Sequence, residues 1–247
     1  MAISLTIDQG NSTAKIALWD SDGNLVEAST HFRFVARDVT KIAHGREIEN
    51  AIYCSVSSRP PTMMRALERR ASRVIEFGVD TPLPISVDYR TPGTLGVDRL
   101  AAAMGAYCLP GCKGKEILVV DLGTAITYDR VTADGRYVGG NIAPGIYMRL
   151  KALNHYTARL PLVDYRDGVT PMWGDDTRTA LLAGAVRGVV AELEYYRNTL
   201  GHDTKVVLTG GGVGVVEPLL SFRPVVDSNL VSRGLFNIME YNLGKRP

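Results

Sequence analysis

The sequence predicts an α/β fold built from two similar halves, and three observations lead to this expectation. A short apolar run that ends in Asp-x-Gly and a small polar residue occurs twice, at Leu5–Asn11 and at Leu118–Thr124. Each copy is followed by a second apolar run and an Asp-Gly turn, at Asp22-Gly23 and at Asp134-Gly135. Stretches with helical composition lie between and after the two copies. A repeat of this kind indicates two copies of one structural unit.

Each copy is predicted to form a strand, a polar turn, a second strand, a tight turn and a third strand, because Asp-Gly between apolar runs is a strong hairpin signal. Helices are predicted at Thr62–Arg73, Val97–Tyr107 and Thr177–Leu200. Pro61 precedes the first, Pro110-Gly111 stops the second, and Gly201 follows the third in the position that favours glycine. Strand units that alternate with helices predict a mixed sheet in each half. With Pro110–Gly114 as the linker, the expected domains are residues 1–112 and 113–247.

Composition excludes several classes of protein. The 247 residues include 28 Lys+Arg and 26 Asp+Glu, a formal net charge of +2, and no Lys/Arg-rich run stands out. Binding that depends on the charge of a nucleic-acid backbone is therefore not expected. With 45% hydrophobic and 22% charged residues the chain is expected to fold as an ordinary globular protein.

The sequence also predicts no membrane partner and a cytoplasmic location. No stretch approaches the roughly 20 apolar residues of a spanning helix. The N-terminal apolar run lacks a basic segment and is interrupted by Asp8, so it is predicted to be a strand and not a signal peptide. The three cysteines are too few and too widely spaced for a disulfide framework. They are expected to be unligated thiols. The four histidines lie outside every motif and are expected to be surface or structural residues.

The two repeated turns offer the chemistry of a phosphate site. Asp8–Lys15, the first turn, and Asp121–Ala125, the second turn, each combine a carboxylate, a glycine and small polar side chains at the end of a strand. Backbone N–H groups in such turns bind anions, and a carboxylate beside them holds Mg²⁺ through water. A single copy is more often a plain hairpin turn. Two copies, with a third glycine turn at Gly210–Gly212, favour a nucleotide site, although no P-loop motif is present.

Five segments together resemble the type III pantothenate kinases, a family of the actin, hexokinase and sugar-kinase superfamily. They are Asp8–Lys15, Tyr89–Arg99, Asp121–Thr127, Asp134–Gly145, and Thr177–Gly184 with the glycine turn after Thr209. The resemblance implies two duplicated ribonuclease-H-like domains with the active site in the cleft between them. It also implies ATP-dependent phosphorylation of pantothenate to 4′-phosphopantothenate, the first step of coenzyme A biosynthesis, by a homodimer.

The resemblance assigns the substrate side of the site to the second segment. Asp98 would be the catalytic base, since phosphoryl transfer needs a group that orients or deprotonates the attacking hydroxyl. Taken alone, an aspartate beside Arg99 is most often a surface ion pair. The implied pantothenate-binding residues are Tyr89, Gly96, Val97, Asp98, Arg99 and Thr177, with Thr179 as an alternative register for Thr177.

The resemblance also assigns the ATP side. Asp8 would hold Mg²⁺ through water, and Asp121 would bind a monovalent cation, K⁺ or NH₄⁺. The implied ATP-binding residues are Asp8, Gln9, Gly10, Asn11, Ser12, Thr13, Ala14, Lys15 and Thr124. For Lys15 the alternative is a solvated lysine at a strand edge. Most family members have threonine where this chain has Ser12, and that change keeps the hydroxyl.

Three alternatives stay open at this point. A non-catalytic accessory protein of the same fold would have little reason to keep Asp98, Arg99 and Asp121 together. A kinase for another small alcohol would differ only in its acceptor. The apolar positions from Thr179 to Tyr196 are either a dimer face or core, and apolar stripes usually pack inward.

Overall fold

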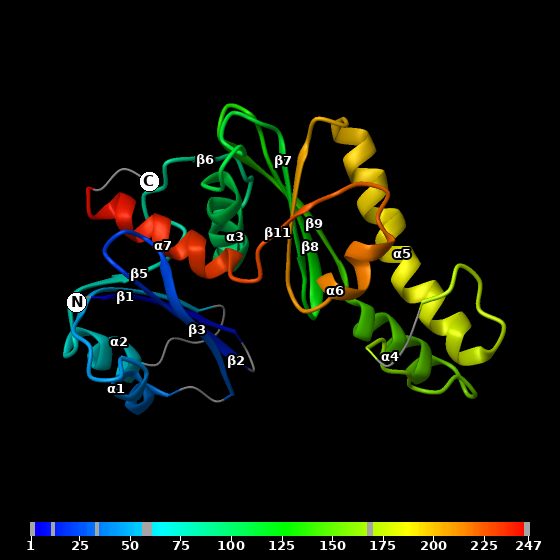
Figure 1. The fold of residues 1–247 in the computed structure, drawn as a ribbon, viewed down its shortest axis with the longest axis horizontal. Helices are drawn as coiled ribbons and strands as arrows, with labels where there is room; N and C mark the ends of the chain where they lie inside the picture. The colour runs from blue at the N-terminus through cyan, green and yellow to red at the C-terminus, as the bar shows by residue number, and fades with distance from the viewer. Residues whose placement is uncertain (1–2, 11–12, 33–34, 56–60, 167–169, 245–247) are drawn as a thin grey trace. The chain divides into compact units, whose positions relative to one another are not determined.

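The computed structural model describes residues 3–10, 13–32, 35–55, 61–166 and 170–244 (Figure 1). The chain forms two compact units. The first unit comprises Met1–Lys113, Gly135–Tyr137 and Asn229–Pro247, and the second unit comprises Gly114–Asp134 and Val138–Ser228. The expected domains, 1–112 and 113–247, stay a prediction, since units defined by packing need not coincide with the duplicated segments.

The first unit is built on a five-stranded sheet in the order β3-β2-β1-β4-β5. Its strands are β1 Ile3–Gln9, β2 Thr13–Trp19, β3 Leu25–Phe32, β4 Ile48–Ser55 and β5 Ala71–Glu76. β1, β2 and β3 form the predicted antiparallel meander, and β4 pairs in parallel with both β1 and β5. Its helices are α1 Val39–Ile42, α2 Pro61–Glu68, α3 Val97–Tyr107 and α7 Leu230–Asn242, with 3-10 turns at Ala36–Asp38 and Pro92–Thr94.

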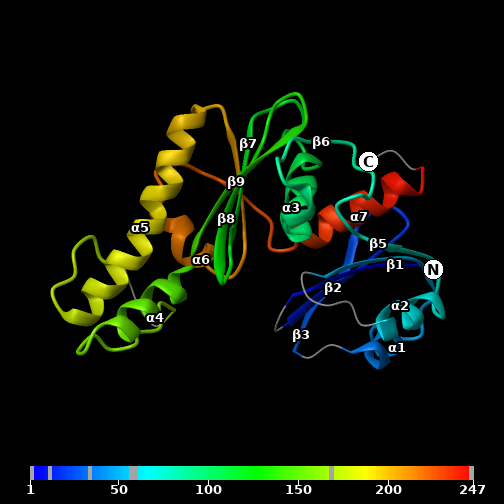
Figure 2. The same ribbon diagram turned by 180° about the vertical axis from the view of Figure 1, so that it is seen from behind.

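Helices cover both faces of this sheet, as two opposite views show (Figure 1, Figure 2). Leu5 and Ile7 alternate with Thr6 along β1 and pack in one cluster with buried residues of α1 and α2. On the other face Thr6 accepts a hydrogen bond from the Trp19 indole at 3.1 Å, and Trp19 stacks on Phe236 of α7 with ring centroids 4.8 Å apart. Residues from the end of the chain therefore complete the core that its first strand begins.

α3 and α7 cross with their backbones in close contact. A Cβ atom at Gly234 of α7 would collide with the backbone carbonyl of Ala101 and lie 2.9 Å from the amide nitrogen of Gly105. A Cβ at Gly105 would collide in turn with the carbonyl of Leu230. The crossing thus depends on glycine on both helices, because no larger residue leaves room for the opposite backbone.

The second unit holds a sheet in the order β11-β10-β7-β8-β9. Its strands are β7 Ile117–Leu122, β8 Ala125–Val131, β9 Arg136–Pro144, β10 Lys205–Thr209 and β11 Val225–Val226. β9 begins in the first unit, where Arg136 and Tyr137 pair in parallel with β6 Ser86–Val87. The helices of the second unit are α4 Ile146–Tyr156, α5 Thr177–Leu200 and α6 Val213–Val216, with a 3-10 turn at Glu217–Leu219.

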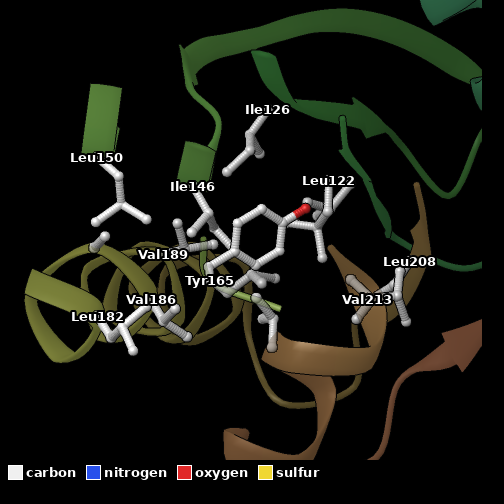
Figure 3. Packing of buried hydrophobic residues seen from close by; sticks show 14 of the residues in the cluster. Leu122, Ile126, Ile146, Leu150, Tyr165, Leu182, Val186, Val189, Leu208 and Val213 are labelled. Carbon is white, nitrogen blue, oxygen red and sulfur yellow. The ribbon is translucent and has the colours of Figure 1, made fainter. Parts of the chain in front are cut away.

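One apolar core holds this unit together, and Figure 3 shows it from close by. Alternate residues of β7, including Leu122, face Ile146 of α4 and Val186 and Val189 of α5. The apolar positions of α5 therefore belong mainly to the core, which was one of the two interpretations left open. Tyr195 is exposed, whereas Tyr196 is tilted over Tyr128 at 4.7 Å.

The predicted α/β class and mixed sheets are confirmed, and two helices begin and end as predicted, at Val97–Tyr107 and Thr177–Leu200. The prediction of helix over Thr62–Arg73 is wrong at its end, where α2 stops at Glu68 and β5 starts at Ala71. Ala71 and Arg73 pair with Ile48 and Asn50 of β4, so pairing with a neighbouring strand outweighs helix propensity there.

Candidate active site

The first turn joins β1 to β2. Asp8 lies directly opposite Lys15 across the two antiparallel strands, and both side chains are half-buried. Residues opposite one another point to the same face of the sheet, so a carboxylate and an ammonium group sit side by side there. The Gly10 N–H donates to the Thr13 carbonyl at 2.9 Å and closes the turn. Asn11 and Ser12 lie outside the described residues.

Gln9 adds an unsatisfied acceptor to this turn. Its side-chain nitrogen donates to the Gly10 carbonyl at 3.3 Å, whereas its Oε1 is buried with no hydrogen-bond partner in the described part of the chain. A buried acceptor without a donor costs free energy and is usually satisfied by water or a ligand. Ala14, by contrast, is fully buried in the apolar core of the first unit.

The second turn joins β7 to β8 in the second unit. Asp121 is the last residue but one of β7, with Thr127 of β8 and Thr209 of β10 as its neighbours in the sheet. A Cβ atom at Gly210 would collide with the Asp121 carboxylate, and Gly210 has φ = +94°. The glycine turn predicted at Gly210–Gly212 therefore packs directly against this carboxylate, in a backbone conformation that favours glycine.

Gly145 supports the second turn from the other side. Its N–H donates to the Thr124 carbonyl at 3.0 Å, and a Cβ atom there would collide with the carbonyl oxygens of Gly123 and Thr124. Thr124 itself is exposed. The Pro144-Gly145 pair, noted in the sequence only as part of a motif, thus fixes the backbone around Thr124.

Arg149 holds this support in place, and the sequence analysis missed it. Its Nε donates to the Pro144 carbonyl at 2.8 Å, and its Nη2 lies 2.7 Å from both carboxylate oxygens of Glu192 on α5. The Tyr128 hydroxyl donates to the same carboxylate at 2.7 Å. Burial, and then the hydrogen bond to Glu192 and the negative charge of that residue, raise the pKa of Tyr128 well above its usual range. A single arginine on a helix gives no signal of such a role in the sequence.

Asp98 lies in the first turn of α3, two residues after the N-cap residue Gly96. The half-buried Asp98 carboxylate accepts a hydrogen bond from the Arg99 N–H at 2.9 Å. The positive end of the helix dipole favours a negative charge at this position. A Cβ atom at Gly96 would lie 2.5 Å from Asp98 Oδ1, so glycine at 96 leaves the carboxylate its room.

The other predicted substrate residues of the first unit surround the start of α3. The Arg99 side chain is buried, with only 7% of the residue exposed, while Val97 is half-buried. Tyr89 is half-buried and tilted over the buried Tyr137, with ring centroids 6.4 Å apart. An arginine this buried is not an ordinary surface ion-pair partner, which was the alternative for the Asp98-Arg99 pair.

At the start of α5 the structure distinguishes Thr177 from Thr179. Asp176 is the N-cap, and its carboxylate accepts from the Thr179 N–H at 2.9 Å while the Thr179 hydroxyl accepts from the Asp176 N–H at 3.2 Å. The Thr179 hydroxyl is therefore already engaged in a capping box at the start of α5. The hydrogen bond from Thr179 holds the pKa of Asp176 below its usual value. Thr177 is exposed beside it.

Cation sites here would rely on single carboxylates. Among the described residues, no group of three or more His, Cys, Asp or Glu side chains is arranged to hold a metal ion. Cys54, Cys108 and Cys112 form no disulfide, and burial raises the pKa of Cys108 to about 11. No helix in the described ranges is long and apolar enough to cross a membrane.

Known proteins resemble this chain along nearly its whole length. The family model described as type III pantothenate kinase matches residues 4–199. A type III pantothenate kinase of Phocaeicola vulgatus is 40% identical over 243 residues, which covers 97% of this chain and 99% of the relative. One from Porphyromonas gingivalis is 36% identical over 250 residues, which covers 98% and 100%.

Solved structures agree on the fold. A ROK family glucokinase from Streptomyces griseus in complex with glucose and AMPPNP matches with a TM-score of 0.57 at 12% identity, covering 97% of this chain and 99% of that one. A Campylobacter jejuni protein described as a Baf family transcriptional activator matches with a TM-score of 0.66 at 22% identity and covers 97% and 99%. At such identities the likeness shows the fold alone. That fold is the actin-like ATPase and sugar-kinase fold, as predicted.

Proposed function

The chain belongs to the type III pantothenate kinase family, and from this premise we propose which of its residues carry out the reaction. It is an enzyme that phosphorylates pantothenate with ATP in coenzyme A biosynthesis. Phosphoryl transfer needs the nucleophile in position, the phosphates held and their charge neutralised. Each of these tasks falls to a different part of the chain.

Asp98 is the catalytic base. The observation that supports this role most directly is a half-buried carboxylate at the N-terminus of α3, oriented by the Arg99 N–H and given room by Gly96. In the reaction Asp98 accepts the proton of the attacking hydroxyl as that oxygen bonds to the γ-phosphorus and the bond to ADP breaks.

Arg99 binds the pantothenate carboxylate, since a guanidinium group offers paired donors to a carboxylate. Tyr89, Gly96 and Val97 shape the same pocket wall. Thr177 contributes a hydroxyl in preference to Thr179, whose hydroxyl already takes part in the capping box.

The first turn binds the phosphates of ATP. Lys15 supplies a compact positive charge, and Gln9 Oε1 is a buried acceptor that a bound water or hydroxyl would satisfy. Thr124 of the second turn binds ATP as well. The complete proposed set is Asp8, Gln9, Gly10, Asn11, Ser12, Thr13, Ala14, Lys15 and Thr124. Ala14 belongs to this set through its backbone, because its side chain is buried in the core.

Asp8 holds Mg²⁺ through water, and Asp121 holds K⁺ or NH₄⁺. Each carboxylate stands one residue before the end of its strand, and that of Asp121 lies against the backbone of Gly210. Bound cations stabilise the negative charge that spreads over the transferred phosphoryl group.

The experiment that tests this proposal measures ADP release by the purified chain with Mg²⁺, in KCl or in NaCl of equal ionic strength. We expect turnover with pantothenate and none with glucose or glycerol, and a higher rate in KCl. The variant Asp121→Asn keeps the shape of the side chain but removes its charge, so the advantage of KCl over NaCl should disappear. Asp164→Asn, an exposed carboxylate in the same unit, should keep that advantage.

Two results would contradict it. Equal turnover with glucose and pantothenate would contradict the assignment of pantothenate as the substrate. A KCl effect that persists in Asp121→Asn would contradict the assignment of Asp121 as the ligand of the monovalent cation.

We further propose that the enzyme is a homodimer. Large apolar side chains are exposed on α4 and in the segments on either side of it, including Trp173 at 84% and Tyr156 at 82% exposure. Concentrations of exposed apolar side chains mark interaction surfaces. Light scattering should give twice the chain mass for the wild type and the mass of one chain for Trp173→Glu. A monomeric wild type at micromolar concentration would refute this proposal. Cysteines that form no disulfide fit a reducing cytoplasm.

A further inference from the structure

A polar pocket lies in the second unit, away from the second turn. It has a volume of about 450 Å³ and is lined by residues just before β7, from the end of α5 through the start of β10, and from the segment that leads into β11. Pockets that bind small molecules commonly measure about 300 to 1,000 Å³. Its size therefore suits a small metabolite.

The sheet register separates this pocket from the second turn. β7 and β10 run in parallel, with Lys205 opposite Ile117 at their starts and Thr209 opposite Asp121 at their ends. The pocket includes Lys205 at the start, whereas the second turn follows Asp121 at the end. Four residue steps of about 3.3 Å put roughly 13 Å between these two ends of the strands.

The lining is strongly basic. Lys115, Arg197, Lys205 and Arg223 reach the pocket from four separate segments, and Asp203 is the single acidic residue among those that line it. With His202 neutral the lining carries a formal charge of +3. Such a concentration of one sign contrasts with the whole chain, whose net charge is +2. Clustered cations around a concave surface attract anions.

Arg197 is held in position before any ligand arrives. Its guanidinium group lies 4.5 Å from the centre of the Phe222 ring and its Nη1 lies 3.0 Å from Nδ1 of His202. Arg197 is also in the last turn of α5, where its charge offsets the negative end of the helix dipole. An approaching anion therefore meets a fixed guanidinium group.

Thr204 supplies a second, independent observation. Thr204 is only 7% exposed, it lines the pocket, and its Oγ1 has no hydrogen-bond partner in the described part of the chain. Its backbone N–H donates to the Gly201 carbonyl at 3.1 Å, which fixes the residue. A buried hydroxyl without a partner is rare in proteins, and a ligand oxygen in the pocket would satisfy it.

We propose that this basic pocket, between the starts of β7 and β10 and the end of α5, binds a small molecule with two adjacent phosphate groups. Two neighbouring phosphates match four cations better than a single one does, because each phosphate then contacts more than one positive side chain. The Thr204 hydroxyl donates to one phosphate oxygen. This site is separate from the second turn, which is proposed to bind ATP.

Inorganic pyrophosphate is the probe. Titration calorimetry measures the binding of pyrophosphate to the full chain in saturating Mg²⁺ and AMPPNP, so that the kinase site is occupied. Sulfate is present in every titration, and the ionic strength is held equal. We expect one pyrophosphate per chain. The double variant Lys205→Glu/Arg223→Glu should weaken binding at least tenfold, and Thr204→Val, which keeps the side-chain shape, should weaken it several-fold.

The matched control is Lys151→Glu, an exposed lysine of α4 in the same unit. It should bind pyrophosphate like the wild type, and Lys205→Glu/Arg223→Glu should keep the wild-type kcat for pantothenate. The proposal is overturned if pyrophosphate does not bind once AMPPNP is saturating, or if all variants bind it equally.

Discussion

Asp98→Asn should lower kcat for pantothenate phosphorylation by about 10²- to 10⁴-fold, the usual contribution of a general base. The amide keeps the shape of the side chain. Its oxygen can still accept the hydrogen bond that the Arg99 N–H donates to the Asp98 carboxylate at 2.9 Å in the wild type. It has no capacity to take the hydroxyl proton. The loss should therefore appear in kcat, while the dissociation constant of ATP and the thermal melting temperature change little. Initial rates of ADP release and calorimetry measure these quantities.

Asp80→Asn is the matched control, because Asp80 is an exposed carboxylate of the same unit. It should keep the wild-type kcat. An Asp98→Asn enzyme with more than half of the wild-type kcat would contradict the assignment of Asp98 as the base. A fall in kcat that comes with a lower melting temperature would instead make Asp98 a structural residue.

Gly234→Ala should reduce the free energy of unfolding by about 1–3 kcal/mol or more, the range for excess volume in a packed interior. The added methyl group would collide with the Ala101 carbonyl, so α3 and α7 must move apart. Because Asp98 and Arg99 stand in the first turn of α3, turnover should fall as well. Urea unfolding followed by circular dichroism, at one fixed protein concentration, measures the change.

Gly184→Ala provides the comparison. Gly184 lies inside α5, and a Cβ atom there would meet no heavy atom within 4 Å. Alanine should raise the free energy of unfolding by up to about 1 kcal/mol through its better helix propensity. Equal stability of Gly234→Ala and wild type would show that the two helices are not closely packed at this crossing.

Local patterns in the sequence predicted the fold well where local signals decide it. α3 and α5 carry stop signals at Pro110-Gly111 and Gly201, and both were predicted with correct ends. The helix predicted to run through Arg73 failed because β5 is formed by pairing with β4, which lies more than 20 residues away in the sequence. Secondary structure that depends on a distant partner leaves little local trace.

The candidate site shows the same division. The two turns and the Asp98 segment were visible as short motifs, and the roles of their residues stay predictions. Arg149 was not visible, since its partners Pro144 and Glu192 are joined to it only by folding. The basic pocket around Arg197 and Lys205 was hidden for the same reason, because its cations are spread over more than 100 residues.

The crossing of α7 on α3 has a consequence for how the enzyme is made. The first unit needs the segment from Asn229 onward, which is made after the whole of the second unit, whereas the second unit has all of its residues once Ser228 has emerged. Domains fold during synthesis as their residues emerge. The second unit is thus the first able to fold. The strands of the first unit are translated earlier, but their core is complete only once α7 has been made. A nascent chain arrested before Asn229 would already carry Asp98 yet lack α7, the helix that packs against α3, so the proposed base gains its packed helix only once α7 has been made.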